Sequence, residues 1–240
     1  LRKVEESKDK KGLFLLPRGH WKSTLITISY TIQRILRNPE IAIFISNATL
    51  VNANSFLREI KHHFEKNEKL RILIGDWIGK EKWTDSEIIV NQRKLARKEP
   101  TIRVGSVDHS VVSSHFDLVI ADDLVNRENT NTKEQCEKVI DYYRDLLDLG
   151  ITDKTEFLIV GTRWDYSDLF AFILEENKKL NNFQVLIKSC WTDKKNKIPL
   201  FYKFTARYLE QLREEKGSFE FGKQYENSVL NDESATFRYS

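Results

Sequence analysis

Methionine is absent from this chain of 240 residues, and cysteine occurs only twice. Cys136 and Cys190 lie far apart and share no metal-ligand spacing, which excludes a disulfide scaffold and a zinc site. We interpret them as reduced core residues of a cytosolic protein. No apolar run is long enough to cross a membrane and no signal peptide is present, so we expect no membrane partner. Because the chain opens on Leu1 and lacks methionine, we expect it to be a piece of a longer protein.

A large excess of charge of one sign is also missing, because the formal net charge is +3 and the isoelectric point is about 8.7. This mildly basic balance permits a nucleic-acid partner without demanding one. There are no internal repeats and no low-complexity segments. With 40% hydrophobic and 31% charged residues, the composition is that of a globular protein rather than a disordered one. The length allows one large α/β domain or two small ones.

The stretch 13–24, LFLLPRGHWKST, has the layout of a phosphate-binding loop. Four apolar residues that suit a buried strand are followed by a Pro-Arg-Gly break, and a long apolar helix begins at Lys22. A helix N-terminus offers unpaired N–H groups and the positive end of its dipole to a phosphate. Lys22 would reach the β- and γ-phosphates of ATP, and the Ser23 hydroxyl would bind Mg²⁺.

The match to the general loop pattern is incomplete. That pattern has glycine at two positions that are occupied here by Leu16 and Trp21, and only Gly19 remains within the loop. The alternative is an ordinary strand-to-helix turn with an exposed lysine. If the loop does bind nucleotide, the residues expected to line the phosphates are Pro17, Arg18, Gly19, His20, Trp21, Lys22, Ser23 and Thr24.

Apolar periodicity predicts strands that alternate with helices along most of the chain. The expected strands are 13–16, 41–45, 116–121, 156–160 and 183–190. The expected helices are 22–37, 48–64, 132–149, 165–178 and 205–215. Between 70 and 107 the pattern is mixed and favours short strands and loops. The alternation predicts an α/β fold with a mostly parallel sheet covered by helices on both faces, and it ends near Pro199.

Polar residues follow three of the expected strands: Lys22 after the first, Asp122 and Asp123 after the third, and Thr162 with Arg163 after the fourth. In open α/β sheets, ligands bind at the carboxyl ends of the strands, so we expect these residues to meet. A carboxylate that follows four apolar residues is costly to bury unless it is paired or bound to a metal, which suits Asp122 beside Mg²⁺. Asp123 would orient or deprotonate the attacking water. The alternative is that the two carboxylates only start a turn.

Arginines near the strand ends are further candidates, because phosphoryl transfer depends on positioning and charge neutralisation. Arg18 lies inside the loop and would contact the γ-phosphate. Arg163 would sense the γ-phosphate and relay its loss to the following helix. Arg127 is a candidate for an arginine supplied to a neighbouring subunit, a contribution worth about 10³–10⁵ in rate where it occurs. For each arginine, a surface role is the alternative.

Three segments, taken in order, resemble the ATPase domain of the large terminase subunit, the motor that packages DNA into tailed-phage capsids: PRGHWKST (17–24), FDLVIADDLVNREN (116–129) and VGTRWDYSDLF (160–170). A fourth segment, 204–229, is similar to the linker region of that family. The resemblance implies a P-loop NTPase fold, a three-layer sandwich of the ASCE type. It also implies an ATPase domain over 1–199 and a linker subdomain over 200–240 that leads to a C-terminal nuclease domain outside this sequence.

The resemblance also implies roles and partners. Lys22, Ser23 and Arg18 match the family's phosphate-loop (Walker A) residues, and Asp122 and Asp123 match the Mg²⁺-coordinating (Walker B) and catalytic carboxylates. The segment 161–163 matches the motif that couples hydrolysis to movement. The implied partners are double-stranded DNA bound without sequence preference, the portal protein, the terminase small subunit and further copies of the chain in a ring. The implied location is the host cytoplasm, transiently at the procapsid portal and not in the mature virion. We expect no DNA cleavage by this chain.

The sequence departs from the family at three places. Trp21 stands where the general loop pattern has glycine, and Asp123 stands where many relatives have glutamate. Ser113, Ser114 and His115 occupy a region where relatives often carry arginine. Two alternative functions stay open: a helicase-like ATPase that separates nucleic-acid strands, and a nucleotide-gated assembly module that binds ATP with little turnover.

Overall fold

In the computed structural model, which describes residues 1–108 and 114–229, the chain forms a seven-stranded sheet in the order β3-β4-β2-β5-β6-β1-β7. The strands are β1 (Lys11–Leu15), β2 (Ile43–Asn47), β3 (Glu87–Ile88), β4 (Ile102–Ser106), β5 (Leu118–Asp122), β6 (Glu156–Gly161) and β7 (Phe183–Ile187). The short edge strand β3 pairs antiparallel with β4, and the other pairs in this sheet are parallel. The predicted α/β class and mostly parallel sheet are therefore confirmed.

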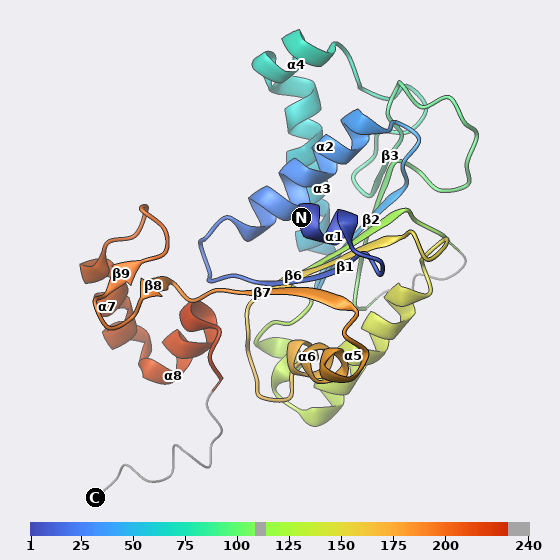
Figure 1. Ribbon diagram of the computed structural model, residues 1–240. Helices are drawn as coiled ribbons and strands as arrows, with labels where there is room; N and C mark the ends of the chain where they lie inside the picture. Colours follow the sequence, from blue (N-terminus) through green and yellow to red (C-terminus); the bar gives the residue numbers. More distant parts are fainter. Residues whose placement is uncertain (109–113, 230–240) are drawn as a thin grey trace, which may run out of the picture.

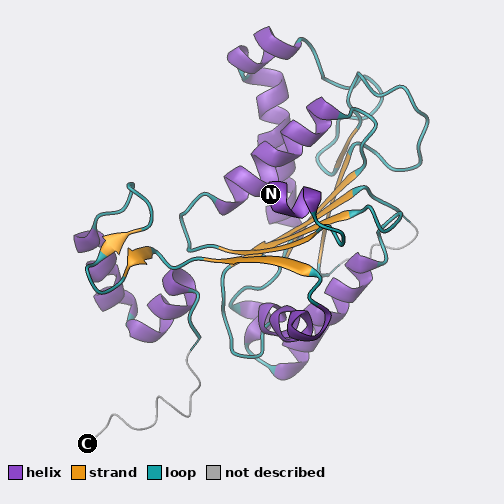
Figure 2. Ribbon diagram, viewed as in Figure 1, coloured by secondary structure: helices purple, strands orange, loops and turns teal. Residues whose placement is uncertain are grey.

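Helices cover both faces of the sheet, as expected from strands that are apolar throughout. One face carries α1 (Arg2–Glu6), the π-helical segment Thr24–Ser29 that continues into α2 (Tyr30–Arg37), and α3 (Leu50–Lys66). The opposite face carries α5 (Lys133–Leu147) and α6 (Leu169–Leu180) (Figures 1 and 2). A capping box starts α5, where the side chains of Thr132 and Gln135 accept hydrogen bonds from each other's backbone N–H groups.

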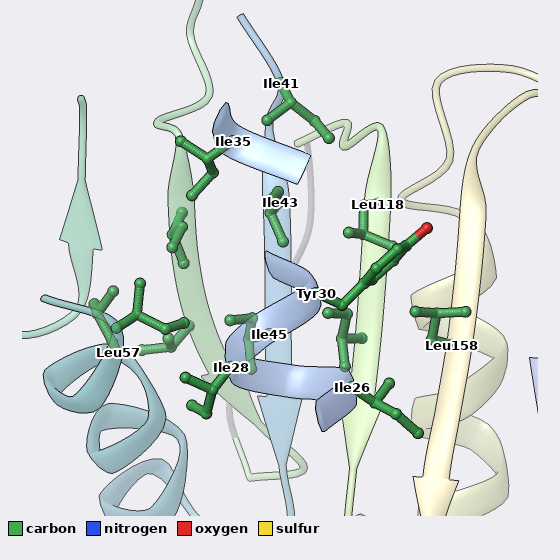
Figure 3. Close-up of a cluster of buried hydrophobic side chains, with 14 of the residues drawn as sticks. Ile26, Ile28, Tyr30, Ile35, Ile41, Ile43, Ile45, Leu57, Leu118 and Leu158 are labelled. Atoms are coloured by element: carbon green, nitrogen blue, oxygen red, sulfur yellow. The ribbon is translucent and has the colours of Figure 1, made fainter. Parts of the chain in front are cut away.

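The core consists of two apolar layers, one on each face of the sheet. Because neighbouring side chains of a strand point to opposite faces, Ile43 and Ile45 of β2 join one layer and Phe44 joins the other. Figure 3 shows the first layer, in which Ile26 and Ile28 of the phosphate-loop helix pack over the strands. This packing fixes the helix that begins at the candidate phosphate loop directly against the sheet.

The short strands and loops expected over 70–107 are present as β3, β4 and their connections, but the start of the region also forms α4 (Glu68–Ile74), a helix that the sequence analysis did not predict. The side chain of Asn67 caps this helix by accepting a hydrogen bond from the Leu70 N–H. The other boundaries lie within a few residues of the expected ones. For example, α6 begins at Leu169 rather than at 165, because the Asp168 side chain caps it by accepting from the Ala171 N–H.

Residues 190–229, called here the C-terminal segment, form a small unit beside the sheet (Figure 1). The unit contains β8 (Trp191–Asp193), β9 (Ile198–Pro199), α7 (Ala206–Lys216), α8 (Ser218–Phe221) and the π-helical segment Gly222–Glu226. Its own apolar cluster joins Cys190 and Trp191 to Leu209, Phe221 and Tyr225. The unit thus begins before residue 200, and residues 230–240 of the expected linker lie outside the described part. Among the described helices, none has the length and apolarity needed to cross a membrane.

Candidate nucleotide-binding site

The polar strand ends meet because β1, β6 and β5 are neighbours and parallel. In the sheet register, Leu15 lies opposite Gly161, and Asp122 lies opposite Val160. The loop after β1 and the turn after β5 therefore open at the same edge of the sheet. The structure brings together Lys22, Asp122 and Asp123 at this edge.

The phosphate loop has two left-handed backbone positions, Gly19 with φ of 77° and Trp21 with φ of 57°. Glycine adopts such angles without strain, which explains why the general loop pattern has glycine at the position of Trp21. Here the tryptophan adopts the same backbone angle, and its side chain is turned outward, with 47% of its surface exposed. Trp21 therefore does not fill the space in front of Lys22.

Lys22 is buried, and its ammonium Nζ lies 3.0 Å from the Asp123 carboxylate Oδ2. Asp123 also has a left-handed backbone, with φ of 49°. Its N–H donates to the Val160 carbonyl (2.9 Å), and its own carbonyl accepts from the Ala48 N–H (3.3 Å). The turn is thus fixed from β6 on one side and from the end of β2 on the other, and it directs the carboxylate toward the lysine.

Asp122 is completely buried, and one of its two carboxylate oxygens has no hydrogen-bond partner among the described residues. The other oxygen, Oδ2, accepts from the Thr27 hydroxyl at 2.5 Å. Burial, together with the nearby Asp123 charge, raises the pKa of Asp122 to about 7 although Lys22 and hydrogen bonds from Thr27 and Ser23 oppose the shift. A buried oxygen without a partner, beside a serine hydroxyl, is a donor set that suits Mg²⁺. These residues therefore fit the metal that the sequence predicts.

A cleft of about 660 Å³ opens in front of these residues. It is lined by residues from five places: the phosphate loop and the start of its helix, the end of β2 with the start of α3, the segment after β5, the segment after β6, and Gln224 of the C-terminal segment. Arg18 and Arg127 both line it and are exposed. Arg127 thus lies at the cleft of its own chain, and its contribution to a neighbouring subunit stays a prediction.

Arg163 is not among the cleft-lining residues. Its guanidinium Nε donates to the carboxylate of Asp168 (3.0 Å) and its Nη2 donates to the carbonyl of Asp165 (3.1 Å). Its backbone N–H donates to the side chain of Asn227 in the C-terminal segment (3.1 Å). The neighbouring Thr162 and Trp164 line the cleft instead. The predicted coupling motif therefore contacts the C-terminal segment through its backbone, while the arginine side chain holds the following turn.

Two residues that sequence reasoning missed organise the site. Thr27 holds Asp122, as described above. Asn47, at the end of β2, donates from its amide to the Asp122 carbonyl (2.7 Å) and accepts from the Thr49 N–H (3.1 Å), so it joins the acidic turn to the start of α3. The only sequence signal for Asn47 was its position as a polar residue after an apolar strand.

The segment in which relatives often carry arginine is only partly described. Ser113 lies outside the described residues. The Ser114 hydroxyl accepts a hydrogen bond from the Arg103 guanidinium of β4 (2.8 Å), and the His115 N–H donates to Glu99 (3.1 Å). An arginine therefore reaches this region from a neighbouring strand.

Comparison with known proteins identifies the fold. No protein-family model and no curated protein sequence matches the chain. Among solved structures, an arginine variant of the Thermus phage P74-26 large terminase ATPase domain is similar, with a TM-score of 0.59 and 15% identity, over 93% of this chain and 90% of that one. The HK97 bacteriophage large terminase has a TM-score of 0.64 and 13% identity, over 94% of this chain and 48% of the terminase. The Phi-28 gp11 DNA packaging motor has a TM-score of 0.58 and 12% identity, over 96% and 68%.

These three structures share the fold of this chain at low sequence identity. The chain spans nearly all of the P74-26 ATPase domain but only about half of the HK97 terminase. The α/β sandwich predicted from the sequence is therefore confirmed as the fold found in large terminase ATPase domains.

Proposed function

We propose that this chain binds and hydrolyses ATP, and that hydrolysis powers translocation of double-stranded viral DNA into a procapsid. The observation that carries the proposal is that Lys22 and Asp123 meet, at one edge of a sheet with this fold, a carboxylate oxygen of Asp122 that has no hydrogen-bond partner within the described part of the chain. The similar structures include an ATPase domain and a DNA packaging motor, which supports both halves of the proposal.

Each residue of the site has a separate task in this proposal. The N–H groups at the start of the helix and the ammonium of Lys22 would hold the β- and γ-phosphates. Ser23 and Asp122 would hold Mg²⁺, which supplies charge neutralisation when bound. Asp123 would accept a hydrogen bond from the attacking water and orient it.

The ion pair between Lys22 and Asp123 would be broken when ATP binds. A triphosphate competes with the Asp123 carboxylate for the ammonium of Lys22, because both are anions that bind the same group. Binding of ATP would therefore free Asp123 to contact water at the time when a phosphate is present.

The arginines would complete the neutralisation of charge. Arg18 and Arg127 line the cleft and are exposed, so their guanidinium groups are available to a phosphate there or to a neighbouring subunit. Arg163 would act through the turn that it holds with Asp168, rather than by touching the γ-phosphate. In this part of the proposal, movement at the end of β6 passes to the C-terminal segment through Asn227.

The wider setting follows from the same proposal. The ATPase part would correspond to residues 1–199 and the linker that leads to a nuclease domain to 200–240, with β8 and β9, which precede residue 200, packed in one unit with the linker helices. The partners would be double-stranded DNA, the portal protein, the terminase small subunit and further copies of this chain in a ring, in the host cytoplasm. Contacts to DNA would be electrostatic and independent of sequence, because a packaging motor has to move along any sequence.

The experiment that tests the proposal is steady-state phosphate release from ATP with Mg²⁺, with and without double-stranded DNA. We expect release by the wild-type protein and its loss in Lys22→Ala. Lys194→Ala is the matched control, because Lys194 is an exposed lysine of the C-terminal segment that pairs with Glu226 (2.8 Å). Equal release by all three proteins would refute hydrolysis at this site. Tight ATP binding without release would favour the assembly-module alternative, and strand separation on a forked duplex would favour a helicase.

A further inference from the structure

Two aromatic side chains of the C-terminal segment pack against the phosphate loop. The Phe204 ring lies against the ring of His20, with centroids 4.9 Å apart. The Phe201 ring meets the Trp21 indole edge to face, with centroids 4.9 Å apart and planes at 69°, and also lies 5.8 Å from His20. We call Phe201 and Phe204 the aromatic clasp.

Backbone contacts reinforce the aromatic clasp. The Arg18 N–H donates to the carbonyl of Gln224 in the C-terminal segment (2.9 Å). At Gly19, an added Cβ would lie 3.0 Å from the Cζ atom of Phe204, so the ring is packed closely over the loop backbone. Each of the loop residues 18–21 therefore contacts the C-terminal segment, and Lys22 follows directly.

The left-handed backbone of Trp21 explains why this loop needs external support. Glycine adopts such a φ freely, whereas a bulky residue is strained there. The free energy gained from one edge-to-face aromatic contact is of the same order as the conformational free energy lost at such a backbone position. The contact between Phe201 and Trp21 can therefore hold a backbone shape that glycine would supply by itself.

We propose that Phe201 and Phe204 are positioning residues for nucleotide binding, and that Phe201 is needed to keep the phosphate loop in its binding shape because tryptophan replaces glycine at position 21. The inference rests on the proposed function, since it concerns the same phosphate site. It assigns to the C-terminal segment a part in forming that site, and it makes Phe201 and Trp21 an interdependent pair.

The test is a double-mutant cycle on ATP affinity. We expect Phe201→Ala to weaken ATP binding on the order of tenfold in the wild-type background, the size of one aromatic contact. In the Trp21→Gly background, the same change should have little effect, because glycine holds the loop without the ring. Phe201→Tyr keeps the ring and should restore binding. Phe204→Ala should weaken binding in either background, because its contacts are with Gly19 and His20.

Phe219→Ala serves as the matched control, because Phe219 is a half-exposed phenylalanine of the same segment whose ring lies against Lys223, 4.5 Å from the Nζ. Its ATP affinity should equal that of the wild type. A second readout needs no nucleotide: amide hydrogen exchange of peptides that cover residues 16–25 should be faster in Phe201→Ala than in Phe219→Ala.

The outcomes separate the inference from the proposed function. Wild-type ATP affinity and unchanged exchange in Phe201→Ala and Phe204→Ala would overturn the inference and leave the ATPase proposal intact. Equal losses from Phe201→Ala in the wild-type and Trp21→Gly backgrounds would also overturn it, because the ring would then act through the general stability of the segment. No ATP binding by the wild type, together with faster loop exchange in Phe201→Ala, would refute the proposed function and retain the role of the ring in holding the loop.

Discussion

The hydroxyl of Thr27 holds the buried Asp122 carboxylate, so its removal is expected to weaken the metal site. Thr27 and Asp122 are both fully buried, and the Thr27 hydroxyl donates to Asp122 Oδ2, while Oδ1 has no partner among the described residues. Thr27→Val keeps the shape of the side chain and removes the donor. Asp122 Oδ2 would then lose its Thr27 donor, and the pKa of Asp122, already raised to about 7, would rise further because one of the hydrogen bonds that favour the charged carboxylate is gone.

The magnitude follows from the strength of such hydrogen bonds. A hydrogen bond to a charged group contributes about 1.5–3 kcal/mol, which corresponds to a factor of roughly 10–100 in an equilibrium constant. Mutation of groups that hold metal ligands weakens metal affinity by a similar factor, about 10–100. We therefore expect the Mg²⁺ concentration for half-maximal ATP hydrolysis to rise by roughly 10–100-fold in Thr27→Val at neutral pH.

The assay is a Mg²⁺ titration of ATP hydrolysis, together with the melting temperature of each variant. Thr27→Ser keeps the hydroxyl and should retain most of the wild-type dependence on Mg²⁺. Thr31→Val is the matched control, because Thr31 lies one helical turn further on, is fully buried and has a hydroxyl without a partner among the described residues. A folded Thr27→Val protein with wild-type dependence on Mg²⁺ would refute the assignment of Asp122 as a metal ligand.

Three further predictions concern stability and reactivity. Gly161→Ala should destabilise the fold by about 1–3 kcal/mol in urea, because an added Cβ would lie 2.2 Å from the ring of the fully buried Phe170; an unchanged midpoint would contradict the packing. The hydrogen bond from Tyr30 lowers the pKa of Glu5 in the folded protein. The ionised Glu5 therefore stabilises the folded state above a pH of about 4.3, and this stabilisation is lost as the pH falls through the lowered pKa. Glu5→Gln should accordingly flatten the acid decline of the melting temperature, and an unaltered decline would speak against this bond. Burial raises the pKa of Cys190 to about 12, so this thiol should react with disulfide reagents only after unfolding, whereas prompt labelling of the native protein would show an open segment.

The meeting of Lys22 with Asp122 and Asp123 could be predicted from the sequence, because local patterns show the strand that precedes each of them. Each follows a short apolar run, and the carboxyl ends of parallel strands share one edge of a sheet. The contacts of Thr27 and Asn47 with Asp122 had no such signal, because they join residues that lie far apart in the sequence and point into the site from a helix and a different strand.

The helix α4 lies at the start of a region where the sequence pattern indicated only short strands and loops. Its Ile72 and Leu73 are 83% and 81% exposed, so these apolar residues do not lie in a core. Asn67 caps the start of the helix and Gly75 follows its end, residue types that favour helix boundaries but that the sequence analysis did not use. The position of Arg163 after a strand was predictable, but its hydrogen bond to Asp168 was not. That bond forms because the turn between β6 and α6 brings the Asp168 carboxylate back to the arginine.

The conformation of Trp21 depended on the rest of the chain. From the sequence, an indole in place of glycine would crowd the phosphates. In the structure the side chain points outward to Phe201, a residue of the C-terminal segment that no local pattern connects with the loop. Compensation of this kind, between a strained position and a distant ring, can be found only once the fold is known.

The central claim is that the cleft at Lys22 and Asp123 turns over ATP. The most direct measurement is phosphate release and ATP affinity in the wild-type protein and in Asp123→Asn, across a range of protein concentrations and with Mg²⁺ present. The account predicts turnover by the wild type, and an Asp123→Asn protein that binds ATP at least as tightly yet releases no phosphate, because it lacks the carboxylate that orients water and competes for Lys22. Phosphate release by Asp123→Asn at the wild-type rate would contradict it.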